Sequence, residues 1–228
     1  MNERATLARL LESSTVVIFD FDNVIVDSEP YHFEAYSRVF AKAGHTLDRD
    51  EYWLEWTSRG GGAESEIRRY SLGLDPAAVR AEKDPIYSAF CGSGAIKPFA
   101  EARAVIEAFE KAGLVLAIAS GSYERDIRAI LRVNGLEDRF GVIVGKDAVK
   151  RTKPAPDTYL AAAERLGVPP QRCLAIEDAE KGVRSAKDAG MSVILIETEI
   201  TKQLKLGGAD LALASLAELR DLLIDVTA

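Results

Sequence analysis

Short apolar runs alternate with amphipathic stretches over most of the chain. The first run, 16–19 (VVIF), is apolar at every position, as expected of a strand buried on both faces of a sheet. Similar runs follow at 114–119, 141–144, 173–176 and 193–196, with a shorter one at 210–213. Stretches with helical spacing separate them, at 101–112, 125–133, 156–166, 182–189 and 216–224. This alternation predicts an α/β fold, a Rossmann-like doubly wound parallel sheet joined by right-handed crossovers.

The region from 27 to 92 departs from this rhythm. Its apolar residues repeat at helical spacing, without an alternating strand pattern, and Gly92-Ser93-Gly94 is expected to be a return hinge. We interpret the region as an insert of about four helices. The predicted organisation is therefore a core formed by 1–26 and 93–228, with a helical domain, 27–92, inserted into it.

The strongest chemical signal comes directly after the first apolar run. Asp20 and Asp22 are two residues apart, so in extended chain their carboxylates leave on the same side. Converging carboxylates repel each other unless a cation lies between them or one of them holds a proton. A hard divalent ion or a proton donor would each be useful in catalysis. The alternative is an ordinary polar loop, in which aspartate is common.

Residues that could bind a phosphate or a metal also lie at or near three other predicted strand ends. Ser120-Gly121-Ser122 precedes a helix, whose free backbone N–H groups would suit a phosphate or simply an N-cap. Lys153 lies between a strand and a helix, where Pro154 would stiffen the backbone; the alternative is a surface lysine. Glu177-Asp178 fits a Mg²⁺ site facing Asp20, or a helix cap. Their coincidence at one sheet edge favours a functional site.

Composition narrows the class of protein. The 228 residues suffice for one large α/β domain or a core with an insert, and the net charge of −7 argues against nucleic acid or an anionic membrane as partner. Residues 1–14 lack the apolar core of a signal peptide, and no run is long enough to span a bilayer. Cys91 and Cys173 have no C-x-x-C partner, so we expect reduced thiols and a cytoplasmic protein.

Four ordered motifs resemble those of the haloacid dehalogenase superfamily of phosphotransferases. They are DFDNVIVDS at 20–28, IASGS at 118–122, KPAPD at 153–157 and IEDAEKG at 176–182. The insert resembles the α-helical cap of the subgroup that contains β-phosphoglucomutase, phosphoglycolate phosphatase and small sugar phosphatases. One departure is Asn23, where the family usually has glycine. Asparagine tolerates a left-handed backbone better than most residues, so we expect the turn to form.

The resemblance implies a role for each motif. Asp20 would be the nucleophile that becomes an aspartyl phosphate, and Asp22 the acid that protonates the leaving oxygen and then the base that activates water. Ser120 and Lys153 would bind the phosphoryl oxygens.

The resemblance also implies Mg²⁺ as the cofactor. Asp20, Asp178 and the main-chain carbonyl of Asp22 would hold the ion, with Glu177 as a direct ligand or a neighbour that supports the ligands.

The expected substrate is a small phosphorylated metabolite, such as a sugar phosphate or phosphoglycolate. Besides Ser120 and Lys153, its candidate binding residues are Gly121, Ser122, His32 and Arg59. His32 could equally be a helix residue packed beneath the cap. The arginine that the mutase carries shortly after a glycine of the cap loop is missing here, where Ala63 follows a run of glycines.

This loss favours a Mg²⁺-dependent phosphomonoesterase over the alternative, a β-phosphoglucomutase-type isomerase. A second alternative is a phospho-acceptor or binding module that does not turn over. We expect a monomer with a moving cap.

Overall fold

The computed structural model describes residues 2–58, 60–198, 201–202 and 207–227. Its centre is a six-stranded parallel sheet of order β3-β2-β1-β4-β5-β6. The strands are β1 (Val16–Phe19), β2 (Val115–Ala119), β3 (Val142–Val144), β4 (Cys173–Glu177), β5 (Ser192–Ile196) and β6 (Leu211–Leu213). β1 is central, with Val16 in register with Val115 of β2 and Cys173 of β4. The predicted doubly wound α/β fold is confirmed.

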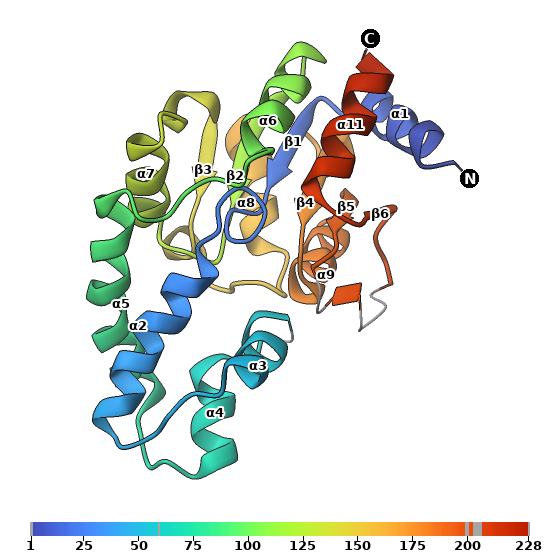
Figure 1. Cartoon of the computed structure of the whole chain (residues 1–228). Coiled ribbons are helices and arrows are strands. Elements are labelled where there is room, and N and C mark those ends of the chain that lie inside the picture. Colours follow the sequence, from blue (N-terminus) through green and yellow to red (C-terminus); the bar gives the residue numbers. More distant parts are fainter. Residues whose placement is uncertain (1, 59, 199–200, 203–206, 228) are drawn as a thin grey trace.

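Helices cover both faces of the sheet (Figure 1). On one face, α1 (Glu3–Ser13), α6 (Ala102–Lys111), α7 (Glu124–Val133) and α11 (Leu216–Thr227) contribute to one hydrophobic cluster. On the other face, α8 (Asp157–Leu166) and α9 (Glu180–Asp188) form a second cluster. Val17 and Phe19 of β1 belong to the first cluster, whereas Val16 and Ile18 belong to the second. Because successive strand residues point to opposite faces, a fully apolar strand fills both layers.

The segment between β1 and α6 is helical, as predicted. It comprises α2 (Glu29–Lys42), α3 (Arg49–Glu51), a π-helix η1 (Tyr52–Ser58), α4 (Gly62–Tyr70) and α5 (Pro76–Ser93). These helices have a hydrophobic cluster of their own, which includes Phe40 and Trp56. In Figure 1 they lie beyond the carboxyl ends of the central strands. Parts of α2 and α5 also pack against the core, since Ala35 and Tyr87 belong to the large cluster that includes residues of β1.

The expected hinge at 92–94 is largely wrong. Gly92 and Ser93 continue α5, and the helix ends only at Gly94, whose φ of 78° is the left-handed conformation that commonly terminates helices. Three short 3₁₀ turns complete the chain as described: η2 (Glu137–Arg139), η3 (Lys146–Ala148) and η4 (Pro170–Arg172). Among the described helices, none is long and apolar enough to cross a membrane.

Candidate active site

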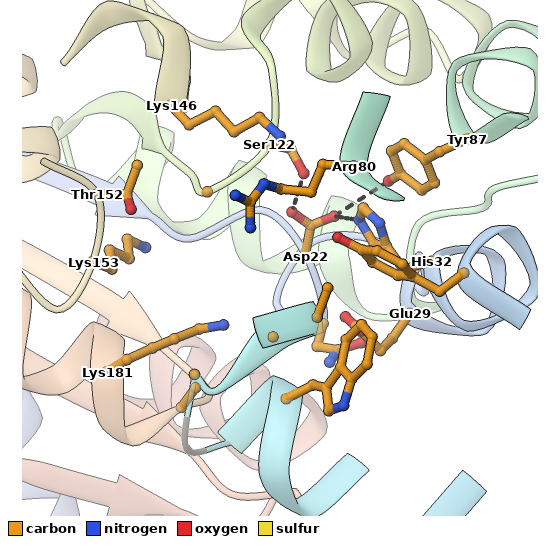
Figure 2. A pocket seen from close by; sticks show the side chains of 18 of the residues that line it. Asp22, Glu29, His32, Arg80, Tyr87, Ser122, Lys146, Thr152, Lys153 and Lys181 are labelled. Carbon is orange, nitrogen blue, oxygen red and sulfur yellow. Dashed lines mark hydrogen bonds and ion pairs between the residues drawn. The ribbon is translucent and has the colours of Figure 1, made fainter. Parts of the chain in front are cut away.

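The site lies where the central strands end and the inserted helices face them. A cavity of about 330 Å³ opens there, lined by the segments that follow β1, β2, β3 and β4 and by residues of α2, α4 and α5. Figure 2 shows side chains from both sides of it. This position is the crevice at the carboxyl edge of an open α/β sheet, where such folds place their ligands.

A buried lysine joins two of the predicted acidic residues. The ammonium of Lys153 donates to Oδ1 of Asp20 at 2.7 Å and to Oε1 of Glu177 at 2.5 Å. Burial, opposed by Lys153, raises the pKa of Asp20 to about 7. Burial alone would lower the pKa of Lys153, but Asp20 and Glu177 raise it above its ordinary value. The lysine is therefore held as a cation beside Asp20, although the three residues come from distant parts of the sequence.

Glu177 is positioned by a close approach of two helical elements. Its Oε1 also accepts a hydrogen bond of 2.7 Å from the buried hydroxyl of Tyr159 on α8. Gly182 of α9 lies against the other side, and a Cβ there would fall 2.0 Å from the carboxyl group. Only glycine leaves room for this side chain. The glycine of the fourth motif thus holds Glu177 in place, in contact with Lys153.

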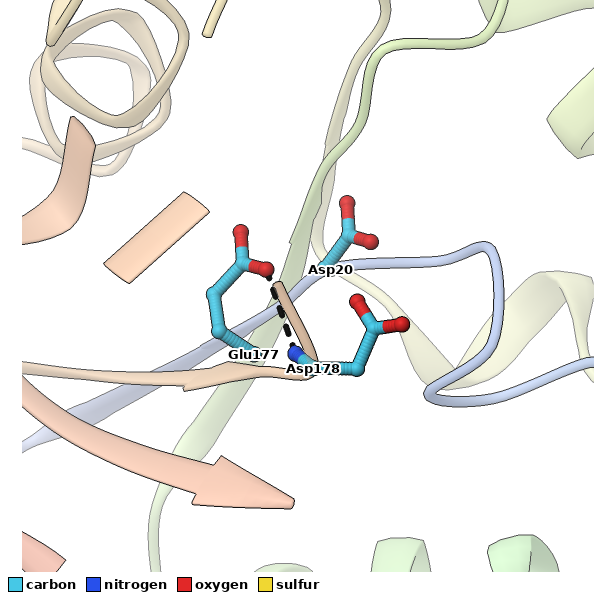
Figure 3. A group of neighbouring side chains, drawn as sticks. All are labelled: Asp20, Glu177 and Asp178. Atoms are coloured by element: carbon cyan, nitrogen blue, oxygen red, sulfur yellow. Dashed lines mark hydrogen bonds between the residues drawn. The ribbon is translucent and has the colours of Figure 1, made fainter. Parts of the chain in front are cut away.

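Asp20, Glu177 and Asp178 bring carboxylate oxygens within 4.8 Å of one another, as Figure 3 shows. Burial, reinforced by repulsion from Asp20 and Glu177, raises the pKa of Asp178 well above its ordinary value. A cation at this point would relieve that repulsion, and clustered carboxylate oxygens are the ligands a hard divalent ion prefers. The donor set therefore fits Mg²⁺. Within Glu177, Oε1 is already engaged by Lys153 and Tyr159, which leaves Asp20 and Asp178 as the freer ligands.

The carboxylate of Asp22 lies outside this group and accepts hydrogen bonds from hydroxyls. Ser28 donates to Oδ1 at 2.5 Å, whereas Ser122 and Ser120 donate to Oδ2 at 2.7 and 3.1 Å. Burial alone would raise the pKa of Asp22, but His32, Ser28 and Ser122 together hold it well below its ordinary value. Because these contacts occupy the side chain of Asp22, only its main-chain carbonyl remains to bind a metal. This is the atom that the resemblance implied.

The chain turns sharply between the two aspartates and α2. Asn23 adopts a φ of 60°, and its N–H donates to the carbonyl of Val26 at 2.9 Å. The expectation that asparagine would form the left-handed turn is confirmed. This turn sends the chain from the end of β1 back toward α2 and so carries Ser28 to the Asp22 carboxylate.

The chain is also similar to known proteins in sequence and fold. The family model of haloacid dehalogenase-like hydrolases matches residues 15–190. The chain belongs to the haloacid dehalogenase-like hydrolases. It is therefore an enzyme of the hydrolase class, and the second alternative, a module without turnover, is set aside.

Three proteins are similar to this hydrolase over most of its length. Protein CbbY of Rhodobacter capsulatus is 32% identical over 206 residues, which cover 85% of this chain and 90% of CbbY. Fructose-1-phosphate phosphatase YqaB of Escherichia coli is 33% identical over 180 residues, covering 78% and 94%. The crystal structure of a mutant CbbY from Rhodobacter sphaeroides, in complex with xylulose-1,5-bisphosphate, is 30% identical with a TM-score of 0.76, and the match covers 90% and 96%.

In this hydrolase, the predicted phosphate-binding residues after β2 are divided between two layers. Ser120 is fully buried; its hydroxyl donates to Asp22 and accepts the N–H of Ser122 at 3.0 Å. Gly121 and Ser122 line the cavity. Ser120 thus lies beneath the surface that a ligand would touch, supporting Asp22 and Ser122. Arg59, the other candidate, lies outside the described residues.

His32 lines the cavity, and sequence analysis missed its neighbour Lys83. The ammonium of Lys83 is 2.8 Å from Nδ1 of His32, and Nε2 of His32 is 3.5 Å from Oδ1 of Asp22. An ammonium that donates to Nδ1 places the ring proton on Nε2, facing Asp22. The ring of Tyr87 stacks on His32 with centroids 3.7 Å apart, and its hydroxyl lies 3.5 Å from Asp22. His32 thus lies in the cavity wall, between Lys83 and Asp22.

Lys83 is only 4% exposed, and burial, followed by repulsion from Lys146, lowers its pKa to about 8. The sequence contains a pattern from which the burial of Lys83 could have been predicted. The buried residues of α5 recur every four positions, and a lysine interrupts that stripe between Val79 and Tyr87. A charged residue on an otherwise apolar helix face usually has a specific partner.

Proposed function

We propose that this hydrolase is a Mg²⁺-dependent phosphomonoesterase that acts on a phosphorylated sugar through an aspartyl-phosphate intermediate. The observation that carries the proposal is that two nearby carboxylates have different surroundings. Asp20 contacts the cation Lys153 and lies beside Asp178, whereas Asp22 faces hydroxyls and His32. A nucleophile needs the first environment and a proton carrier the second.

In the first step, a carboxylate oxygen of Asp20 forms a bond to phosphorus as the bond from phosphorus to the sugar oxygen breaks. Asp22 gives a proton to that leaving oxygen. In the free site Asp22 is ionised, and the arrival of a negatively charged phosphate beside it raises its pKa and allows it to carry the proton. In the second step, Asp22 takes a proton from water as the water attacks phosphorus, which releases phosphate and restores Asp20.

Lys153 and the Gly121–Ser122 segment would contact the phosphoryl oxygens. The ammonium of Lys153 neutralises part of their charge, while the hydroxyl of Ser122 is fixed by Asp22. Mg²⁺, held by Asp20, Asp178 and the carbonyl of Asp22, would supply further positive charge and a template. Glu177 keeps Lys153 aligned with Asp20.

The helical region 27–92 is proposed to be a cap that closes over this chemistry. Its separate hydrophobic cluster supports the assignment, as does the fact that His32 and Tyr87 reach Asp22 from α2 and α5. Closure would exclude water while the leaving group departs. We further propose that the enzyme is a cytoplasmic monomer without a nucleic acid or membrane partner.

A phosphorylated sugar is the substrate class that the relatives support. YqaB is named for fructose 1-phosphate and CbbY was crystallised with xylulose-1,5-bisphosphate. The cavity of about 330 Å³ lies at the lower end of the range of small-molecule sites, roughly 300–1,000 Å³.

The test is a panel of sugar phosphates, with p-nitrophenyl phosphate as a general probe, assayed for phosphate release. With Mg²⁺ we expect turnover of several sugar phosphates. Removal of the metal with EDTA should lower kcat/KM at least about a hundredfold, because the ion supplies several kcal/mol of charge stabilisation. Phosphate release that is indifferent to EDTA and to added Mg²⁺ would contradict the proposal.

A β-phosphoglucomutase-type phosphoryl transfer is the second candidate. It is favoured by one observation, the presence of an arginine, Arg80 of α5, in the cavity wall where a distal phosphate could be held. The same assay separates the two functions. A mutase converts β-glucose 1-phosphate to glucose 6-phosphate in the presence of a bisphosphate and releases little free phosphate.

A further inference from the structure

Three cationic side chains reach the cavity at the end where the cap meets the core. Arg80 and Lys83 come from α5, and Lys146 comes from η3, directly after β3. Figure 2 shows Arg80 and Lys146 on the same side of the cavity as Ser122. Lys146 is close enough to both α5 cations to interact with them electrostatically. Like charges converge only at a cost unless an anion joins them.

Lys146 is the least compensated of the three. Its ammonium lies 3.8 Å from the centre of the Tyr123 ring, and among the residues the structure describes no carboxylate oxygen comes within 4.0 Å of it. The acids that face it, Asp22, Asp84 and Asp126, have other partners, and Asp22 accepts its hydrogen bonds from serine hydroxyls. Asp126 accepts a hydrogen bond of 2.8 Å from Ser88, and Asp84 lies 4.0 Å from Lys83. The half-buried Lys146 therefore presents its charge to the cavity.

Arg80 is only partly neutralised. One guanidinium nitrogen forms an ion pair with Glu64 of α4, and both residues line the cavity. A guanidinium has five N–H donors, so several remain for a ligand. The cap loop lacks the arginine expected from the mutase pattern, but α5 brings one to the cavity from a different position in the sequence.

We propose that Lys146 and Arg80 bind a second anionic group of the substrate, distinct from the phosphate that Lys153 contacts and that is cleaved. The inference rests on the proposed function and deepens it, because it names the substrate class as doubly anionic: a sugar bisphosphate or a phosphorylated sugar acid. Lys146 is then a specificity-determining residue supplied by the core, while Arg80 is supplied by the cap and is brought to the anion when the cap closes.

The first experiment compares kcat/KM for fructose 1,6-bisphosphate with that for fructose 6-phosphate. We expect the wild-type enzyme to prefer the bisphosphate, and Lys146→Ala to reduce the ratio of the two values about tenfold to a hundredfold, the effect of losing a charge-assisted hydrogen bond. Lys146→Arg should restore most of the ratio. Lys150→Ala, which removes an exposed lysine from the same loop, is the matched control and should leave the ratio unchanged. A wild-type enzyme without this preference, or a ratio unaffected by Lys146→Ala, would overturn the proposal.

The second experiment separates this inference from the proposed reaction. Calorimetry on the Asp20→Asn chain measures binding of the same two sugars without requiring turnover. We expect the bisphosphate to bind at least about tenfold more tightly, and the added substitution Lys146→Ala to remove that difference. Equal affinities would refute the second anion site even if phosphatase activity is found. Conversely, a Lys146-dependent difference supports the site even if no hydrolysis is detected.

A third comparison, of 6-phosphogluconate with glucose 6-phosphate, identifies the anion. A Lys146-dependent gain for the carboxylate as large as that for the second phosphate assigns the site to any terminal anion. A gain confined to the bisphosphate assigns it to phosphate. Both results support a doubly anionic substrate.

Discussion

The two walls of the cavity differ in how their charges are matched. On the core wall, the ammonium of Lys153 is shared between Asp20 and Glu177, and Glu177 also accepts a hydrogen bond from the buried Tyr159. On the opposite, cap wall, Lys83 is buried against a histidine and a tyrosine ring, and the core residue Lys146 faces it from above another ring. On the core wall, the charges of the proposed reaction site already balance one another. The cap wall and Lys146 present positive charges that an anionic group of the proposed substrate would neutralise. This is the difference expected between a surface that catalyses a reaction and one that selects the substrate.

The largest expected effect comes from the core wall. Asp20→Asn removes the proposed nucleophile while keeping the size of the side chain, so Mg²⁺-dependent hydrolysis of p-nitrophenyl phosphate should fall at least about a thousandfold. Asp138→Asn, at an exposed aspartate of η2, is the matched control and should retain full activity. An Asp20→Asn chain with more than a few per cent of wild-type kcat/KM would show that the phosphoryl group does not pass through this residue.

The next effect tests Asp22. For Asp22→Asn, kcat/KM should fall about a hundredfold to ten-thousandfold with a sugar phosphate, whose leaving oxygen needs a proton. It should fall less with p-nitrophenyl phosphate, whose leaving group departs as a stable anion. Because kcat/KM reports the steps up to the first irreversible one, the later attack of water does not blur the comparison. Equal losses with both substrates would mean that Asp22 positions the phosphate and does not protonate the leaving group.

The contrast between the walls also explains what sequence could predict. The strands and the acids that follow them were predictable, because a strand buried on both faces is apolar throughout and ends abruptly at the sheet edge. Asp20 and Asp178 meet simply because β1 and β4 are neighbours in the sheet. Local pattern and topology were sufficient for this wall.

The cap wall was largely missed for the opposite reason. The contact of Lys83 with His32 joins residues 51 positions apart on two helices, and Lys146 meets the cap helix α5 only through the packing of cap on core. Lys146 follows the end of β3, so its place at the sheet edge could have been predicted. Its proposed role in binding an anion depends on Arg80 of α5, whose position near it no sequence pattern indicates. Such a juxtaposition depends on tertiary packing, which no motif in the sequence records.

A smaller effect, on stability, tests the support of the core wall. In Gly182→Ala, the new Cβ would collide with the buried Glu177 carboxyl and force it away from Lys153 and Tyr159, which should lower the free energy of unfolding by about 2–4 kcal/mol. Gly92→Ala in α5 is the matched control, because no atom lies within 4 Å of its added Cβ; it should stabilise the helix by about 0.5–1 kcal/mol. Urea denaturation measures both. Similar losses for the two alanines would show that the tight fit of Glu177 is unimportant.

The smallest effect is a gain in stability on the other wall. Burial lowers the pKa of Lys83 from 10.5 to about 8, so the folded protein disfavours the charged amine by about 3 kcal/mol below pH 8. Lys83→Met keeps the length and apolar bulk of the side chain but removes the charge. Loss of the contact with His32 offsets part of the gain, so we expect a net increase of about 1–2 kcal/mol in the free energy of unfolding at pH 7.

The pH dependence of that gain identifies its cause. Between pH 8 and 10.5 the folded wild-type protein has lost the Lys83 proton while the unfolded chain still holds it, so unfolding takes up a proton and wild-type stability rises with pH. The advantage of Lys83→Met should therefore shrink as the pH rises from 7 to 10, whereas Lys150→Met, at an exposed position, should show no such trend. An advantage that stays constant with pH would show that it comes from packing, and that burial of the Lys83 charge does not destabilise the fold.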